Sequence, residues 1–290
     1  RIATGRGPHE VAVSHDGRLA YVSNYGMHGV FREGQRVNEP GNTISVLDLE
    51  TRAVKDTFDL GTYAKPHGIA VSRDGRHLWV TCEDSRTVLE LDAGTGAVRK
   101  AWKTGQETSH MIVPAVDETK LFVANIRSGS ATVIERATDR VTSLVTAPGA
   151  EGIAVSPDGR EVWVTNRADS SISVLDARAD TLIAKIESGG RFPIRVKFTP
   201  DGREAWVSCL ESNAVTVFDA RTRQLLATLP VGAAPVGIQM APDGKRAYVA
   251  NTNDDLVTVI DVAARKVIAT FTTGNEPDGM AWASRSKRGR

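Results

Sequence analysis

Short hydrophobic runs separated by turn residues occupy the whole chain. In one representative stretch the runs cover residues 152–156, 161–166, 171–176 and 181–188, and they are rich in Val, Ile and Thr. Short runs of β-branched and aromatic residues bounded by turns are typical of β-strands. No stretch shows sustained helical periodicity with capping residues. The pattern therefore predicts an all-β protein in which each repeat supplies four strands.

The same four-run unit returns about every 42 residues. Between its first two runs stands a tight turn such as Pro157-Asp158-Gly159, in which Pro presets φ and Gly accepts a positive φ. An aromatic residue marks the middle of the second run, where we expect it to pack between neighbouring units. These aromatic residues are Tyr21, Trp79, Phe122, Trp163, Trp206 and Tyr248. Four-stranded units with this period form β-propeller blades.

The number of blades depends on the two ends of the chain. Six units are complete, residues 1–5 resemble a last strand, and residues 277–283 resemble a first strand. We predict an all-β, seven-bladed β-propeller that forms a single domain over residues 1–290. Its closing blade is shared by both termini and is incomplete on the N-terminal side.

Composition and cysteine placement narrow the classes of function. Lys plus Arg number 36 and Asp plus Glu number 35, so the chain lacks the basic excess expected of a nucleic-acid-binding protein. No run of about 18 apolar residues is present that could span a membrane. Cys82 and Cys209 occupy the same position in repeats three blades apart, which is too far for a disulfide. We interpret both as buried free thiols.

One position, at the start of the first strand of each repeat, carries most of the candidate chemistry. We name it the inner column, and its residues are His9, His67, His110, Glu151, Ile194, Val236 and Asp278. Closure of the ring brings the five polar members into one arc. Imidazole and carboxylate groups suit zinc, copper, iron, nickel or manganese, and three histidines with one or two carboxylates leave a position open for water or substrate. The sequence therefore predicts one metal ion, with ligands chosen from His9, His67, His110, Glu151 and Asp278.

The next position along the chain suggests further site residues. It holds glycine in four repeats, which indicates close approach of the backbone, but Glu10 and Arg195 break this rule. We predict that Glu10 orients an imidazole or acts as a general base, and that Glu151 can also serve as a base. Arg195 is predicted to clamp a carboxylate or phosphate of a small polar or anionic ligand. A surface ion pair is the alternative for both Glu10 and Arg195.

An insertion of about 16 residues, at 26–41, lies on the face of the predicted channel mouth. We predict that it forms a lid or substrate loop, in which His28 and Arg32 contact the ligand. Two other interpretations of the histidines stay open: a ligand pocket without metal, and duplicated residues with a structural role. The sequence has no glycine-rich phosphate loop, no nucleophile elbow and no Cys-x-x-Cys-His haem attachment motif.

Three segments carry a resemblance to a known family. Tyr21-Val22-Ser23-Asn24, Trp163-Val164-Thr165-Asn166 and Tyr248-Val249-Ala250-Asn251 resemble the hallmark of YVTN-type β-propeller repeats, and the likeness covers essentially the whole chain. The resemblance extends to lactonase-like hydrolases, haem- or copper-carrying propellers, surface-layer modules and YncE-like periplasmic proteins. It implies a periplasmic or secreted location.

Together the residues and the resemblance predict an exported propeller that binds a metal ion and a small polar ligand. Lactonase-like hydrolysis is the leading expectation for its activity. The alternatives are a non-enzymatic periplasmic protein that carries metal or docks other proteins, and a copper- or iron-dependent oxidoreductase. The oligomeric state stays open.

Overall fold

The computed structural model describes the backbone of residues 1–30 and 36–284, and the side chains of these ranges apart from residues 28–30, 36 and 37. The described chain divides into two compact units, residues 1–112 with residues 281–284, and Val113–Met280. The described ranges contain no α-helix and only two 3-10 turns, η1 (Leu210–Ser212) and η2 (Thr252–Asp254). No helical segment found there is long and apolar enough to cross a membrane.

The first unit contains two four-stranded antiparallel sheets, each with its strands in sequence order. Their bounds are β1 (Pro8–Val13), β2 (Leu19–Val30), β3 (Arg36–Asp48), β4 (Ala53–Asp59), β5 (Pro66–Val71), β6 (His77–Cys82), β7 (Thr87–Asp92) and β8 (Val98–Lys103). The boundary between the units falls within β9 (Ser109–Pro114).

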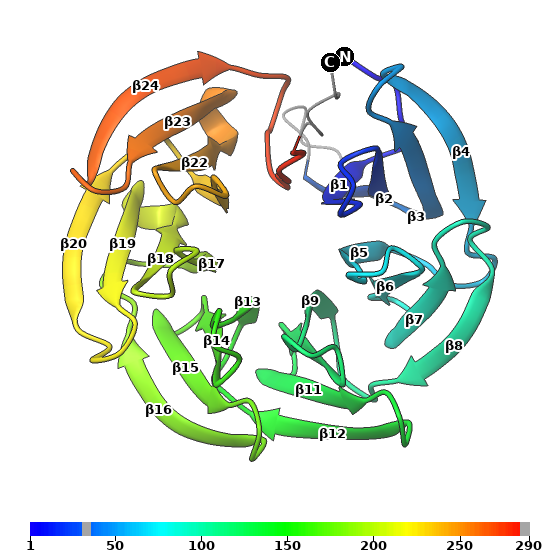
Figure 1. Ribbon diagram of the computed structural model, residues 1–290, viewed down its shortest axis with the longest axis horizontal. Coiled ribbons are helices and arrows are strands. Elements are labelled where there is room, and N and C mark those ends of the chain that lie inside the picture. Colours follow the sequence, from blue (N-terminus) through cyan, green and yellow to red (C-terminus); the bar gives the residue numbers. More distant parts are fainter. Residues whose placement is uncertain (31–35, 285–290) are drawn as a thin grey trace. The chain divides into compact units, whose positions relative to one another are not determined.

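The second unit repeats the same sheet. In Figure 1, β13 and β17 lie along the inner side of this unit, while β16, β20 and β24 follow its outer rim. The bounds are β10 (Lys120–Asn125), β11 (Ser130–Glu135), β12 (Arg140–Val145), β13 (Ala150–Val155), β14 (Glu161–Asn166), β15 (Ser171–Asp176), β16 (Thr181–Glu187), β17 (Pro193–Phe198), β18 (Glu204–Cys209), β19 (Ala214–Asp219), β20 (Leu225–Pro230), β21 (Pro235–Met240), β22 (Arg246–Asn251), β23 (Leu256–Asp261) and β24 (Lys266–Thr272).

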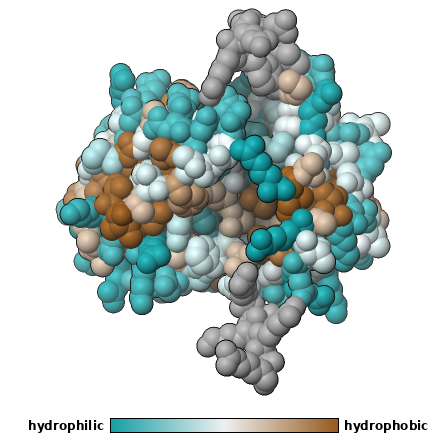
Figure 2. Space-filling view, turned by 90° about the horizontal axis from the view of Figure 1, so that it is seen from above, coloured by the Kyte–Doolittle hydropathy of each residue, from teal (hydrophilic) through white to brown (hydrophobic). Residues whose placement is uncertain are grey.

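Burial follows the position of a strand within its sheet. Five of the six residues of β14 and of β15 are buried, whereas β24 is exposed along all seven of its residues. The aromatic residues of the second strands are buried as predicted, except for the half-buried Tyr248. Figure 2 shows apolar surface on the side where β24 lies, and Val267, Ile268 and Phe271 are among its exposed residues. The core therefore sits between the second and third strands of neighbouring sheets.

A β-bulge interrupts the first strand of five sheets at the same place. In β5, for example, the pairing register shifts between Pro66 and Ile69, and equivalent shifts occur in β1, β13, β17 and β21. A bulge removes one residue from the ladder and redirects side chains. Five residues of the inner column fall within these bulges, so their side chains depart from regular strand alternation: His9, His67, Glu151, Ile194 and Val236.

A hydroxyl group on the second strand binds each of four bulges to the next sheet. The Gly68 N–H donates to Thr81 Oγ1 at 2.9 Å, and Thr81 Oγ1 donates to the His110 carbonyl at 2.6 Å. The equivalent hydroxyl groups belong to Ser23, Thr165 and Ser208, which bind the carbonyls of His67, Ile194 and Val236. The four carbonyl groups that accept these hydrogen bonds belong to inner-column residues, which confirms the sequence alignment of His67, His110, Ile194 and Val236.

The structure corrects the predicted number of blades. The described residues form six four-stranded blades of a β-propeller, not seven. Residues 1–5 and 277–283 form no strand. A strand needs a partner for its backbone N–H and C=O groups, and the described residues provide no middle strands for a shared seventh blade.

The insertion at 26–41 lies at the end of the β2–β3 hairpin. Within the insertion, β2 and β3 continue as a ribbon that pairs Gly26 with Pro40 and Val30 with Arg36. The side chain of His28 and all of Arg32 lie outside the described residues, so their roles stay predictions. Cys82 and Cys209 are buried and free, as predicted.

Candidate metal centre

Three histidines gather where the first strands of three sheets begin. His9 lies on β1, His67 on β5 and His110 on β9. The ring centroids of His9 and His67 are 4.0 Å apart, and those of His67 and His110 are 3.7 Å apart. His67 and His110 are buried, and His9 is half-buried. The structure therefore brings together the three histidines of the inner column, which are far apart along the chain.

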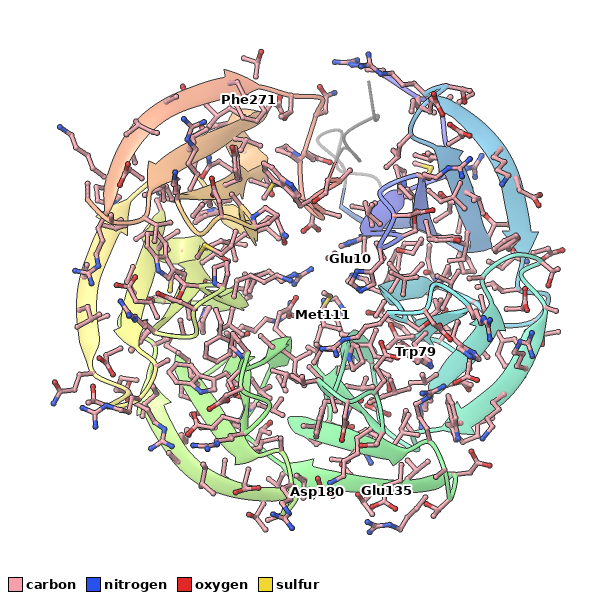
Figure 3. All side chains as sticks on the ribbon, in the orientation of Figure 1. Glu10, Trp79, Met111, Glu135, Asp180 and Phe271 are labelled. Carbon is pink, nitrogen blue, oxygen red and sulfur yellow. The ribbon has the colours of Figure 1, made fainter. Side chains whose placement is uncertain are left out.

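Two buried carboxylates complete this group. Glu10 has an oxygen within 4.8 Å of ligand nitrogens on both His9 and His67, and Glu83 has one within the same distance of nitrogens on His67 and His110. Among the described residues these are the two sets able to hold a metal ion, and they share His67. We name His9, Glu10, His67, Glu83 and His110 the histidine cluster. Glu10 projects on the inner side of the first unit, as does Met111 (Figure 3).

Glu83 is anchored through both of its carboxylate oxygens. Its Oε1 lies 2.6 Å from His110 Nδ1, and its Oε2 accepts a hydrogen bond of 2.6 Å from the Tyr25 hydroxyl. Burial raises the pKa of the Glu83 carboxyl. The hydrogen bonds from His110 and Tyr25 offset this effect and hold the pKa below its usual value. Both carboxylate oxygens of Glu83 therefore have a hydrogen-bond partner.

Local sequence explains why the histidines can approach one another. A Cβ built on Gly68 would lie 2.5 Å from the His110 carbonyl oxygen, and one on Gly152 would lie 2.2 Å from the Ile194 carbonyl oxygen. Real Cβ atoms do not come this close, so only glycine lets the next first strand pass. The close backbone approach predicted from these glycines is confirmed. Gly68 in this way sets the distance between β5 and β9.

The other predicted site residues belong to the second unit, where they form a network of opposite charges. Arg195 Nη1 lies 3.7 Å from Glu151 Oε1, and Arg195 Nη2 lies 3.8 Å from Asp278 Oδ1. Glu151 Oε2 also lies 2.7 Å from Arg167 Nη1. Glu151 and Arg195 are buried. The metal-ligand roles of Glu151 and Asp278, the base role of Glu151 and the clamp role of Arg195 stay predictions.

Sequence reasoning missed Glu83 and Tyr25. Tyr25 directly follows Tyr21-Val22-Ser23-Asn24, and Glu83 follows the aligned segment of its repeat, Trp79-Val80-Thr81-Cys82. Arg167 occupies the same position in its own repeat. Tyr25 has its ring centroid 5.5 Å from those of His9 and His67, Glu83 contacts His110, and Arg167 contacts Glu151. An alignment of this following position, in addition to the inner column, would have found all three residues.

The donor set fits a borderline transition-metal ion. It offers imidazole nitrogens and carboxylate oxygens, the ligands that zinc, copper, iron, nickel and manganese accept in proteins. The two described cysteines lie buried at the cores of their blades, and burial raises the pKa of Cys82 to about 12 and of Cys209 to about 11. Thiols with such pKa values do not supply thiolate ligands near neutral pH.

Comparisons with known proteins support the propeller fold. The family model "Cytochrome D1 heme domain" matches residues 109–240, and "Lactonase, 7-bladed beta-propeller" matches residues 2–115. A search of curated proteins gave no match.

Two solved structures resemble the whole chain. Hydrazine synthase of Kuenenia stuttgartiensis has a TM-score of 0.81 at 20% identity, over 96% of this chain and 90% of that chain. The β-propeller domain of Cps50 (Swd1) of Myceliophteria thermophila has a TM-score of 0.76 at 13% identity, over 95% and 89%. At these identities the likeness establishes the fold alone.

Proposed function

We propose that the chain, a β-propeller whose residues 2–115 match the lactonase family model, binds one transition-metal ion at the histidine cluster. We propose further that the bound ion serves to hydrolyse a lactone or ester of a small polar or anionic molecule. Zinc, copper, iron, nickel and manganese all fit the donor set.

One observation carries the proposal: three imidazoles from three first strands lie in ring contact beside two buried carboxylates. Protonation of neighbouring imidazoles would place like charges about 4 Å apart, which is costly away from water. Neutral imidazoles around a shared cation avoid that repulsion and place their nitrogens next to an opposite charge. A metal ion therefore explains the arrangement better than a purely structural stack of histidines.

The residues of the chain have separate tasks in this proposal. His9, His67 and His110 bind the ion through ring nitrogens. A bound ion supplies Lewis-acid activation of water and of a carbonyl oxygen. Glu10 lies beside His9 and His67 and accepts the proton of the attacking water. Glu10 is buried, and its backbone N–H donates to Ser23 Oγ, which fixes the start of its side chain.

Metal analysis of purified protein tests the proposal. We expect about one equivalent of metal in the wild type and its loss in His67→Ala and His110→Ala. His15→Ala is the matched control, because His15 is exposed. Equal metal content in the wild type and both cluster variants would overturn the metal site. Bound metal without turnover on a panel of lactones and esters would overturn hydrolysis and leave metal carriage.

A second function is favoured by one comparison. The haem-domain family match spans residues 109–240 and begins at the strand of His110. A redox role, with haem, copper or iron at the histidine cluster, is therefore the alternative proposal. Addition of haem followed by absorption spectroscopy separates the two. A Soret shift that His110→Ala abolishes supports redox function, and an unchanged spectrum rules out haem ligation there.

We also propose an exported location, periplasmic or secreted, on the resemblance to YVTN-type propellers. Fractionation of cells that express the full-length gene product tests it. Recovery only from the cytoplasmic fraction would contradict export.

A further inference from the structure

The geometry points to Glu83 as a positioning residue for the metal ion: it holds His110 through Nδ1, and Tyr25 holds Glu83 in turn. His110 then presents Nε2 to the ion. This inference rests on the metal-binding function proposed above and assigns the atom by which one ligand binds. Neither Glu83 nor Tyr25 stands in the inner column.

The contacts of Glu83 favour support over direct ligation. One carboxylate oxygen lies 2.6 Å from His110 Nδ1 and the other 2.6 Å from the Tyr25 hydroxyl. The Tyr25 hydroxyl donates to one Glu83 oxygen, and in the inferred arrangement His110 Nδ1 donates its N–H to the other. The neutral ring then has its lone pair on Nε2, the nitrogen able to bind a cation. Metal-bound histidines commonly donate their second ring N–H to a carboxylate, which fixes ring orientation and raises basicity.

The surroundings of this chain of contacts restrict its movement. Glu83 and His110 are 8% and 7% exposed. The His110 backbone is held separately, because its carbonyl accepts the hydrogen bond from Thr81. The Tyr25 ring contacts the rings of His9 and His67, two of the proposed ligands. Its hydroxyl group binds Glu83, the carboxylate that contacts the third ligand, His110. A change at Tyr25 should therefore reach the ion without removing a ligand.

The same first unit offers a matched comparison outside the histidine cluster. His77 Nδ1 lies 3.3 Å from Glu90 Oε1, and Glu90 Oε2 accepts a hydrogen bond from Trp79 Nε1. Glu90 is buried, as Glu83 is. Substitution of Glu90 therefore reproduces the loss of a buried carboxylate beside a histidine, without a metal site.

Metal affinity and ligand spectroscopy test the inference together. Zinc affinity is measured by competition with a chromophoric chelator, and copper(II)-loaded protein is examined by electron paramagnetic resonance. We expect Glu83→Gln to bind zinc about 10–100-fold more weakly than the wild type. Its copper g and hyperfine values should stay unchanged, because the donor atoms stay the same. Tyr25→Phe should weaken zinc binding several-fold, and Glu90→Gln should bind like the wild type.

The outcomes separate this inference from the proposed function. Failure of the wild type to bind zinc or copper overturns both. Binding by the wild type with equal affinities in Glu83→Gln and Glu90→Gln overturns only the positioning role. A changed copper hyperfine splitting in Glu83→Gln identifies Glu83 as a ligand and also overturns positioning. If Glu83→Gln fails to fold, Tyr25→Phe decides, since it removes one hydroxyl group, and unchanged zinc affinity there refutes the inference.

Discussion

Thr81→Val tests whether the bulge hydroxyl holds the sheets and the histidine cluster together. Thr81 is fully buried, accepts the Gly68 N–H at 2.9 Å and donates to the His110 carbonyl at 2.6 Å. Valine has nearly the same shape but no hydroxyl group. The substitution therefore leaves one backbone N–H and one carbonyl buried without their hydrogen-bond partner.

The magnitude follows from these two groups. An unsatisfied buried polar group costs about 1–3 kcal/mol, so together the two groups should lower the free energy of unfolding by about 2–6 kcal/mol. Thr81→Ser is the control, because it keeps the hydroxyl group and loses one methyl group, at a cost of about 1 kcal/mol. The N–H of Gly68 should also exchange with solvent faster in Thr81→Val than in Thr81→Ser.

Urea denaturation followed by two optical probes measures the loss, and coincident transitions establish that one free energy describes it. Hydrogen exchange of the peptide that contains Gly68 locates the change. The reasoning is refuted if Thr81→Val and Thr81→Ser lose the same stability. It is refuted equally if exchange at Gly68 is unchanged, since the N–H would then have another partner.

Three further predictions concern residues outside the histidine cluster. Burial raises the pKa of Cys209 to about 11. Cys209 should therefore resist a thiol-specific disulfide reagent at about pH 8 in folded protein and react after denaturation. Rapid labelling of the folded protein would contradict its burial. Arg195→Met should lower the free energy of unfolding in urea by about 3 kcal/mol, because Glu151 and Asp278 lose a balancing charge. Arg203 is exposed, so the control Arg203→Met should change that free energy little. Similar losses in the two variants would show that the Arg195 network adds nothing to stability. The hydrogen bond from Arg99 lowers the pKa of Asp92 from 3.8 to about 2. The stabilisation by ionised Asp92 is therefore present above about pH 3.8 and lost as the pH falls through about 2. Asp92→Asn should lose less stability than the wild type over this interval, and equal acid unfolding profiles would contradict the shift.

Strand positions were predictable from the sequence because turns and hydrophobic runs are local signals. The expected runs at 161–166 and 171–176 coincide with β14 and β15, and the run at 152–156 is displaced only slightly from β13. The glycines next to the inner column correctly indicated close backbone approach. Each of these features depends on residues that are neighbours in the chain or in the repeat.

Features that depend on partners were not predictable in the same way. The terminal runs have strand-like composition, yet residues 277–283 form no strand, since composition does not reveal whether a partner strand is present. Glu83 lies in the turn after β6, and Tyr25 lies within β2; at either place a polar residue is unremarkable until its neighbours are known. The bulges were also missed, because a one-residue slip in pairing leaves no mark in hydrophobic periodicity.

The position of the three histidines on β1, β5 and β9 has a consequence for how the first unit holds together. An ion bound by all three would cross-link strands that are about 100 residues apart in sequence, and such closure restricts the unfolded chain far more than a local contact does. Removal of the ion by a chelator should then lower the melting temperature. This decrease should grow with the logarithm of the free metal concentration that was present before chelation. Metal supply in the surroundings would in this way set the lifetime of the folded protein.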